Sequence, residues 1–216
     1  MGKLNLIIGP MFSGKTTRLI KTHNKYIIGN DEKFNIIAIN HKLDARYTEN
    51  SICSHDLIKI PCISLNKLSD YYSLYNNGYE VNNKVILIDE AQFFDDLFYF
   101  CLNIVDNTDT IIYVFGLSGD FKREKFGQVL DLIPIADNIK HLKGMCSRCE
   151  NYNHSLFTKK LVNNNKNNDN KNDNNDNDND DDNDNDDNND TQISVGGSEK
   201  YISVCRKCYL DKEEED

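Results

Sequence analysis

The sequence predicts an α/β fold, in which helices cover both faces of a mostly parallel sheet, joined to a small zinc-binding unit. Apolar runs of strand length alternate with helical patterns over the first two thirds of the chain. Three of those runs end at glycine or carboxylate residues, where parallel sheets place their ligands. Two Cys-x-x-Cys pairs then follow. Together these features predict a ligand-binding sheet with a metal-stabilised appendage.

The apolar runs define the expected elements in chain order. Residues 4–8 form a continuous apolar strand that ends at Gly9, and Lys15–Ile28 has helical spacing and stops at Gly29. The other expected elements are strands at 34–39, 85–88 and 111–115 and helices at 65–75 and 95–105. Such βαβ alternation is typical of parallel sheets, which bind ligands beyond the C-terminal ends of their strands.

Composition changes near Leu142. We therefore expect a first domain at 1–142, a second unit at 143–210 and an acidic tail at 211–216. The short runs at 154–162 and 193–196 are expected to pair as a hairpin, because a long loop at a hairpin tip costs little additional entropy.

Residues 163–190 contain only Asn, Asp and Lys, and they carry −9 of the net charge of −10. This segment has no apolar side chain to bury, so we predict a disordered insertion. The rest of the chain is close to neutral. The acidic composition therefore gives no argument for or against nucleic-acid binding.

The chain has no apolar stretch near the roughly 20 residues that a membrane helix needs. The first apolar run leads into a glycine-containing loop, whereas a signal peptide would lead into a cleavage site. We expect a cytoplasmic protein with no membrane partner. In that compartment seven cysteines indicate metal ligands or free thiols and not a disulfide framework.

The segment after the first strand matches the pattern G-x-x-x-x-G-K-[ST], and a strand before it and a helix after it are the right context. It consists of Gly9, Pro10, Met11, Phe12, Ser13, Gly14, Lys15 and Thr16. In such loops backbone N–H groups surround phosphate oxygens, and the helix adds its positive end. Lys15 is expected to reach the β- and γ-phosphates of a nucleoside triphosphate, and Thr16 to supply a hydroxyl to Mg²⁺. The pattern predicts a P-loop fold of the RecA-like type.

The strand expected at 85–88 ends in two carboxylates, Asp89 and Glu90. In P-loop enzymes a carboxylate at this place engages Mg²⁺, directly or through water. Neighbouring side chains on a strand point in opposite directions, so one residue can serve the metal and the other the nucleophile. Glu90 is the candidate general base.

Two Cys-x-x-Cys pairs lie in the second unit, and they provide the candidate metal ligands Cys146, Cys149, Cys205 and Cys208. Without the insertion 163–190, their separation approaches that of a four-cysteine zinc site. Four thiolates leave no open position on a tetrahedral Zn²⁺ ion, so we expect a structural zinc. Cys53, Cys62 and Cys101 are isolated and are expected to be buried apolar residues.

Several further segments resemble the type II thymidine kinases, a family with cytosolic vertebrate, bacterial and poxviral members. They cover nearly the whole chain outside the insertion and are GPMFSGKTT at 9–17, LDARY at 43–47, IDEAQFF at 88–94, GLSGDFKREKFG at 116–127, FTKKL at 157–161, VGGSEKY at 195–201 and the cysteine pairs. The resemblance implies transfer of a phosphoryl group from ATP to the 5′-hydroxyl of thymidine or deoxyuridine, as in nucleotide salvage. It also implies a homotetramer with no nucleic-acid partner.

The resemblance also implies roles for single residues. Glu90 would take the 5′-hydroxyl proton, and Asp89 would act on Mg²⁺ with Thr16. Asp44, Arg46 and Gln92 would belong to the nucleotide site. The nucleoside would contact Phe93, Leu117, Phe121, Phe126, Thr158, Val195, Gly196 and Tyr201. Among these, Thr158 would lie near the thymine ring, and Tyr201 would hold the 3′-hydroxyl at the end of a loop, called the lasso, that grips the base.

Three positions in the 116–127 segment differ from the family pattern. Ser118 and Asp120 replace residues that are commonly Asp and Thr, and Lys125 stands where Pro is frequent.

Two other interpretations of the function remain. A different P-loop enzyme, such as a general NTPase or a nucleoside monophosphate kinase, would share the phosphate loop, but a monophosphate kinase would need additional arginines. A nucleic-acid-binding zinc ribbon would need a basic face with interleaved aromatic residues.

Overall fold

The computed structural model describes residues 1–29, 35–44, 50–54, 56–77, 83–149, 153–161 and 196–211. Its centre is a six-stranded sheet in the order β5-β2-β6-β7-β1-β8, and every neighbouring pair is parallel. The strands are β1 (Lys3–Gly9), β2 (Asn35–His41), β5 (Ile63–Leu65), β6 (Asn83–Ile88), β7 (Ile111–Leu117) and β8 (Asn138–His141). This confirms the predicted parallel sheet, which β5 and β8 widen at its two edges.

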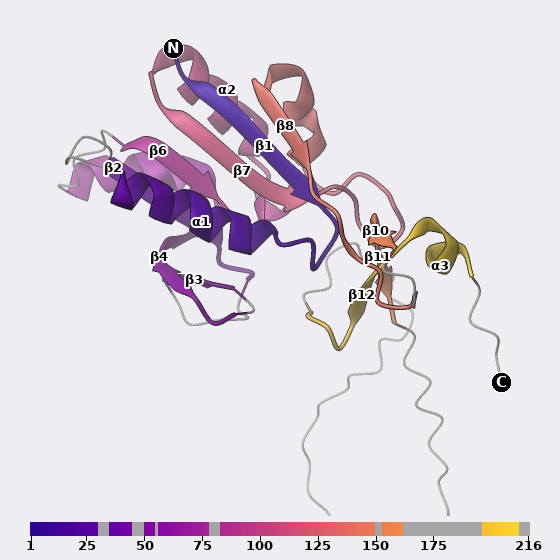
Figure 1. Cartoon of the computed structure of the whole chain (residues 1–216). Helices are drawn as coiled ribbons and strands as arrows, with labels where there is room; N and C mark the ends of the chain where they lie inside the picture. The colour runs from indigo at the N-terminus through magenta and orange to yellow at the C-terminus, as the bar shows by residue number, and fades with distance from the viewer. Residues whose placement is uncertain are drawn as a thin grey trace, which may run out of the picture.

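Helices cover both faces of the sheet, as the sequence predicts (Figure 1). Helix α1 (Lys15–Ile28) lies in front of the sheet in this view and buries Leu19 and Ile20 against strand residues such as Ile7. The opposite face carries helix α2 (Leu97–Asn107) and two 3₁₀ helices, η1 (Leu68–Asn77) and η3 (Val129–Ile135). Side chains on the strands alternate between these two cores, because successive residues point to opposite faces.

The segment expected as a helix at 65–75 differs in the structure. Leu65 is the last residue of β5, and a 3₁₀ helix begins only at Leu68. Leu68 and Tyr71 are both buried in the core. A spacing of three residues fits a 3₁₀ helix as well as an α-helix, so apolar periodicity did not separate the two.

The second unit follows directly on the sheet: β8 ends at His141 and β9 begins at Gly144. Its elements are β9 (Gly144–Met145), β10 (His154–Ser155), β11 (Phe157–Lys160), β12 (Tyr201–Val204) and α3 (Arg206–Leu210). We call the described residues from 144 onward the cysteine unit. A further hairpin, β3 (Ser51–Cys53) with β4 (Lys59–Pro61), and a short 3₁₀ helix, η2 (Ala91–Phe93), belong to the sheet part of the chain.

The hairpin of the cysteine unit differs from the one expected. Strand β11 pairs antiparallel with β12, from Phe157 opposite Val204 to Lys160 opposite Tyr201. Within the described residues, the partner of the first arm is therefore 201–204. Residues 193–195 of the expected second arm lie outside the described residues. Tyr201 and Val204 are buried, and the strand runs straight into Cys205, so this pairing also brings the two cysteine pairs together. Residues 162–195, with the predicted disordered insertion, lie outside the described residues.

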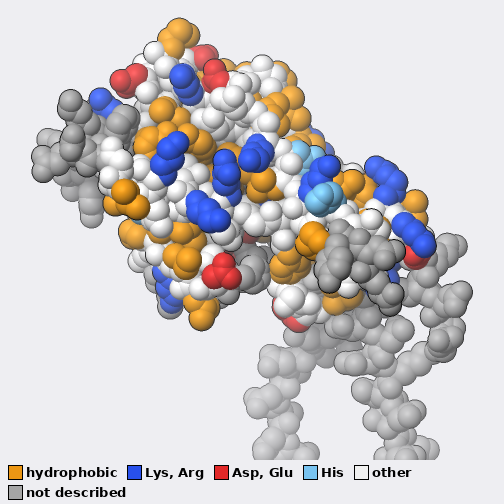
Figure 2. Space-filling view, in the orientation of Figure 1, with side chains coloured by type: hydrophobic (Ala, Val, Ile, Leu, Met, Phe, Trp, Pro, Cys, Tyr) orange, Lys and Arg blue, Asp and Glu red, His pale blue; other side chains and the backbone are white. Residues whose placement is uncertain are grey.

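Basic side chains gather over the face that α1 covers (Figure 2). A groove beside this helix is lined by Arg18, Lys21, Lys25 and Lys140. These cations belong to the sheet part of the chain and not to the cysteine unit. Within the described ranges, no helix has the length and apolar character needed to cross a membrane.

Candidate active site and metal centre

The phosphate loop joins the end of β1 to the start of α1. Gly14 adopts the left-handed conformation, with φ of 82°, immediately before the helix, and Phe12 is also left-handed at 59°. The Lys15 ammonium donates to the carbonyls of Gly9 at 3.2 Å and Pro10 at 2.7 Å. The lysine side chain therefore lies folded over the loop, close to where such loops hold phosphate oxygens.

The first turn of α1 faces the end of β6. The Thr16 hydroxyl donates to the Asp89 carboxylate at 3.4 Å, and Asp89 is buried. Burial raises the pKa of Asp89, and the negative charges of Glu90 and Asp44 raise it further. A hydroxyl beside crowded carboxylates is an oxygen donor set that suits Mg²⁺, and such a cation would favour the ionised carboxylates.

Glu90 follows β6 in a backbone conformation that is uncommon outside glycine, with φ of 46° and ψ of 42°. Its carboxylate accepts a hydrogen bond from the Gln92 side-chain amide at 2.6 Å. Asp44 lies nearby at the end of β2, where the Asn40 amide donates to its carboxylate at 3.1 Å. Strand ends of β1, β2 and β6 thus supply the phosphate loop and three carboxylates to one region.

One pocket collects most of the site residues that the sequence predicts. The predicted residues that line it are Met11, Phe12, Gly14, Lys15, Thr16, Asp44, Asp89, Glu90, Gln92, Phe93, Leu117, Phe121, Phe126, Thr158, Gly196 and Tyr201. Gly9, Pro10 and Ser13 lie in the loop but outside this lining, and the Ser13 hydroxyl donates to the Pro10 carbonyl at 2.8 Å. Arg46 and Val195 lie outside the described residues.

Aromatic side chains from several elements contact one another in the pocket lining, and we call this part of the pocket its aromatic end. Phe93 meets Phe126 edge-to-face with ring centroids 5.7 Å apart, and Phe121 lies 6.2 Å from Tyr201. The Thr158 hydroxyl accepts a hydrogen bond from the Met11 N–H at 3.0 Å. Lys15 is the only cationic residue among the described residues that line the pocket. This end of the pocket therefore suits a flat, uncharged ligand.

Sequence reasoning missed four lining residues, Thr17 and the β3 residues Ser51, Ile52 and Cys53. The β3 segment carries no motif and is too short to show a strand pattern, so no signal in the sequence indicated it. Asp120 also lines the pocket, but its carboxylate accepts N–H bonds from Lys122 at 2.9 Å and Glu124 at 2.8 Å. The Asp120 carboxylate therefore stabilises the turn that follows β7.

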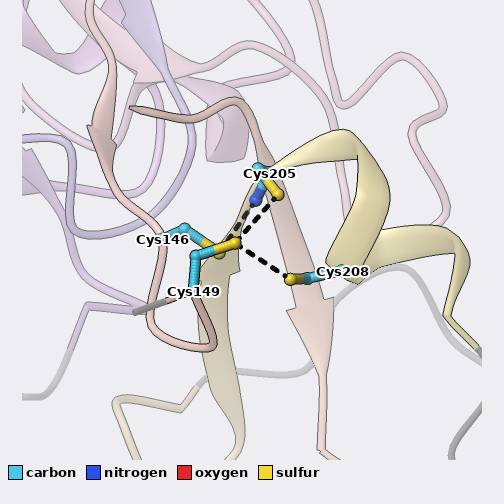
Figure 3. Close-up of side chains that lie close together, drawn as sticks. All are labelled: Cys146, Cys149, Cys205 and Cys208. Atoms are coloured by element: carbon cyan, nitrogen blue, oxygen red, sulfur yellow. Dashed lines mark hydrogen bonds between the residues drawn. The ribbon is translucent and has the colours of Figure 1, made fainter. Parts of the chain in front are cut away.

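Four thiols form a compact cluster in the cysteine unit (Figure 3). The sulfur atoms of Cys146, Cys149, Cys205 and Cys208 all lie within 4.8 Å of one another. Cys149 lies 3.6 Å from Cys205 and 3.4 Å from Cys208. A tetrahedral zinc with Zn–S bonds of about 2.3 Å would separate its sulfur atoms by about 3.8 Å. The cluster therefore has the ligand type, number and spacing for Zn²⁺.

The thiols of this cluster differ in acidity. Burial acts to raise the pKa of Cys146, but N–H groups of Cys205, Arg148 and Cys149 donate to its sulfur and hold the pKa below its ordinary value. The pKa of Cys208 is raised, first because its thiol shares a hydrogen bond with Cys149. Four thiolates this close together would repel one another, and a bound cation would compensate their charge.

The cysteine unit contacts the loop after β7 through the residue that follows Cys208. The Tyr209 hydroxyl donates to the Phe121 carbonyl at 2.8 Å, and the Arg123 guanidinium lies 4.3 Å from the centroid of the Tyr209 ring. Phe121 lines the pocket. Tyr209, the neighbour of Cys208 in the chain, thus connects the cysteine cluster to the aromatic end of the pocket.

Comparison with known proteins identifies the relatives of this chain. The family model described as thymidine kinase matches residues 2–209. A thymidine kinase of Oryza sativa subsp. japonica is 36% identical over 212 residues, which cover 97% of this chain and 67% of that protein. A thymidine kinase of Myxoma virus (strain Uriarra) is 34% identical over 210 residues, with 97% of both chains covered. On this evidence, and with its phosphate loop, paired carboxylates and four-cysteine cluster in place, the chain belongs to the thymidine kinase family.

Proposed function

We propose that this protein transfers the γ-phosphoryl group of ATP, with Mg²⁺, to the 5′-hydroxyl of thymidine or deoxyuridine. The observation that carries the proposal is the pocket itself, which joins a phosphate loop, two adjacent carboxylates and an aromatic end whose described lining residues include no cation. Family membership supports the same reaction, because the relatives are named thymidine kinases. The product would be thymidine monophosphate, as in nucleotide salvage.

The phosphate loop would bind the triphosphate through its backbone N–H groups and Lys15. The Lys15 ammonium would exchange the carbonyls of Gly9 and Pro10 for phosphate oxygens. Thr16 and Asp89 would hold Mg²⁺, which neutralises charge on the phosphoryl group when it is bound. The raised pKa of Asp89 supports this role, because the cation would compensate the crowded carboxylates.

Glu90 would orient and deprotonate the 5′-hydroxyl. It lines the pocket beside Asp89, at the boundary between the phosphate loop and the aromatic end. A positioned base contributes roughly 100- to 10,000-fold to rate, and placing the hydroxyl in line with the phosphoryl group contributes further.

The aromatic end would hold the nucleoside base between Phe93, Phe121 and Phe126, with Leu117 and Thr158 at its edge. Tyr201 would bind the sugar, and Gly196 belongs to the lasso that would close over the base. A nucleoside monophosphate would bring a second phosphate, and the described lining offers it no arginine. An uncharged acceptor therefore fits better.

The four-cysteine cluster would bind a structural Zn²⁺ and hold the segment that follows β9 against the end of β12 and the start of α3. The cations nearby have internal contacts: Lys159 donates to the carbonyls of Cys208 and Asp211, and Arg206 lies over the Phe157 ring. A structural role fits this arrangement better than a nucleic-acid-binding ribbon does. We further propose a homotetramer, for which the family resemblance is the support.

The proposal is tested by offering γ-labelled ATP and Mg²⁺ with each of four deoxynucleosides. Label is expected on thymidine, deoxyuridine or both, and not on deoxyadenosine or deoxyguanosine. ATP hydrolysis without a labelled nucleoside would instead support a general NTPase. Label only on added monophosphates would support a monophosphate kinase.

A further inference from the structure

The side chain of Gln92 forms hydrogen bonds in two directions inside the protein. Its Nε2 donates to the Glu90 carboxylate at 2.6 Å, and its Oε1 accepts from the Leu117 N–H at 3.2 Å. Gln92 is buried at the wall of the pocket. The sequence placed Gln92 in the nucleotide site, but both ends of its amide are used within the protein.

The two contacts fix which way the amide points. The Leu117 N–H can only donate, so it must face the amide oxygen and not the NH₂ group. The NH₂ group is then turned toward Glu90, whose ionised carboxylate can only accept. Gln92 thus links the Glu90 carboxylate to the Leu117 N–H at the end of β7, whose position the sheet fixes.

Glycines allow the close packing around Gln92. A Cβ atom at Gly127 would clash with the Gln92 carbonyl oxygen, and Gly127 also has φ of 55°. A Cβ atom at Gly116 would lie 2.8 Å from a Val129 methyl group and 3.5 Å from the Gln92 Oε1 atom. The backbone of residue 127 therefore packs against the backbone of Gln92, while strand β7 lies beside its side-chain oxygen.

Glu90 needs such a contact because its backbone lies in the left-handed region between β6 and η2. Glu90 belongs to neither a helix nor a strand, so regular backbone geometry does not determine where its side chain points. We propose that Gln92 is a positioning residue, which holds the Glu90 carboxylate in the direction required to take the 5′-hydroxyl proton. The inference rests on the proposed function, in which Glu90 is the base.

The most specific test is Gln92→Glu. Glutamate has the same length and still offers an oxygen to the Leu117 N–H, but it replaces the donor that faces Glu90 with a second oxygen. We expect kcat to fall about 10- to 100-fold, while the KM values for ATP and thymidine change less than about threefold. Gln92→Met, which removes both hydrogen bonds without adding charge, is expected to lower kcat as well and carries the test if the first variant does not fold.

Gln128 provides a matched control. Its side-chain oxygen accepts from the Phe98 N–H at 2.8 Å, and it does not line the pocket. Gln128→Glu makes the same chemical change in the same kind of contact, away from Glu90. We expect its kcat to stay within about twofold of that of the unmodified enzyme, because the new carboxylate lies away from Glu90. If any new carboxylate lowered kcat in a general way, the kcat of both variants would fall.

A double-variant cycle separates positioning from an independent structural effect. In the Glu90→Gln background, Gln92→Glu is expected to change the residual kcat less than about twofold, because no base remains to be positioned. An equal fold loss in both backgrounds would overturn the inference, as would a Gln92→Glu enzyme with unchanged kcat. If Glu90→Gln alone retained turnover, the assignment of the base would fail instead, whatever Gln92 does.

Discussion

The Met11 N–H of the phosphate loop donates a hydrogen bond to the Thr158 hydroxyl of strand β11, at 3.0 Å. This contact joins the nucleotide end of the pocket to the cysteine unit, across 147 positions in the chain. Thr158 is buried, and both residues line the pocket. The cysteine unit therefore contacts the phosphate loop directly. Thr158 would make this contact in addition to the proposed one with the nucleoside base.

Thr158→Val should weaken this connection. Valine has nearly the same shape but no acceptor, so the Met11 N–H loses its partner in a buried site, at a cost of about 1–3 kcal/mol. We expect a lower free energy of unfolding by urea and a KM for ATP raised about three- to tenfold. Thr158→Ser keeps the hydroxyl and is the control. Equal stability and equal ATP KM in the valine and serine variants would show that the contact is unimportant.

Tyr209→Phe should affect the nucleoside and not ATP. The change removes the hydroxyl that donates to the Phe121 carbonyl and leaves the ring under Arg123. We expect the KM for thymidine to rise about three- to tenfold with little change in the KM for ATP, measured by steady-state kinetics. Tyr99 is exposed on α2, so Tyr99→Phe is a suitable control. An unchanged thymidine KM in the Tyr209 variant would show that this contact with the loop after β7 does not affect nucleoside binding.

Cys205→Ser should release the metal. Elemental analysis of the unmodified protein is expected to give about one zinc per chain, and the variant should lose it because three thiolates and a hydroxyl bind zinc more weakly. We also expect a higher thymidine KM or unfolding of the cysteine unit. Cys62→Ala removes a buried thiol outside the cluster and should keep its zinc. Full zinc content in the Cys205 variant would contradict the four-thiolate site.

His41 should make stability depend on pH. Burial lowers its pKa below 6.5, while Nδ1 accepts from the Leu43 N–H and Nε2 contacts the Asn66 carbonyl. The unfolded chain therefore binds a proton more readily than the folded one, and stability falls as pH drops below about 6.5. The slope is at most about 1.4 kcal/mol per pH unit for one proton. Urea unfolding at pH 7.5 and 5.5 should show a smaller difference for His41→Gln; an identical difference would exclude His41 as the cause.

The sequence predicts best what local patterns encode. The strand, loop and helix from Lys3 to Ile28 form as expected, because an apolar run, a glycine loop and helical spacing follow one another without interruption. Asp89 and Glu90 lie at a strand end for the same reason. Strand β8 was missed, since all four of its residues are exposed and hydropathy gives it no signal.

Long-range pairing explains the other differences. The sequence did not identify 201–204 as a strand partner of β11, because pairing of Tyr201 with Lys160 depends on contacts across the intervening chain. The link between Gln92 and Leu117 is likewise tertiary and has no local pattern. The four cysteines were found because their chemistry restricts their spacing, and the structure brings them together.

The most direct test of the account is phosphoryl transfer by Glu90→Gln. The variant keeps the size of the side chain and the phosphate loop, so nucleotide binding measured by calorimetry should be within about threefold of the unmodified protein. Transfer of labelled phosphate from ATP to thymidine should fall at least about 100-fold, the usual contribution of a positioned base. Normal ATP binding with this loss would support Glu90 as the base. Turnover within about fivefold of the unmodified enzyme would contradict it and remove Glu90 from the mechanism.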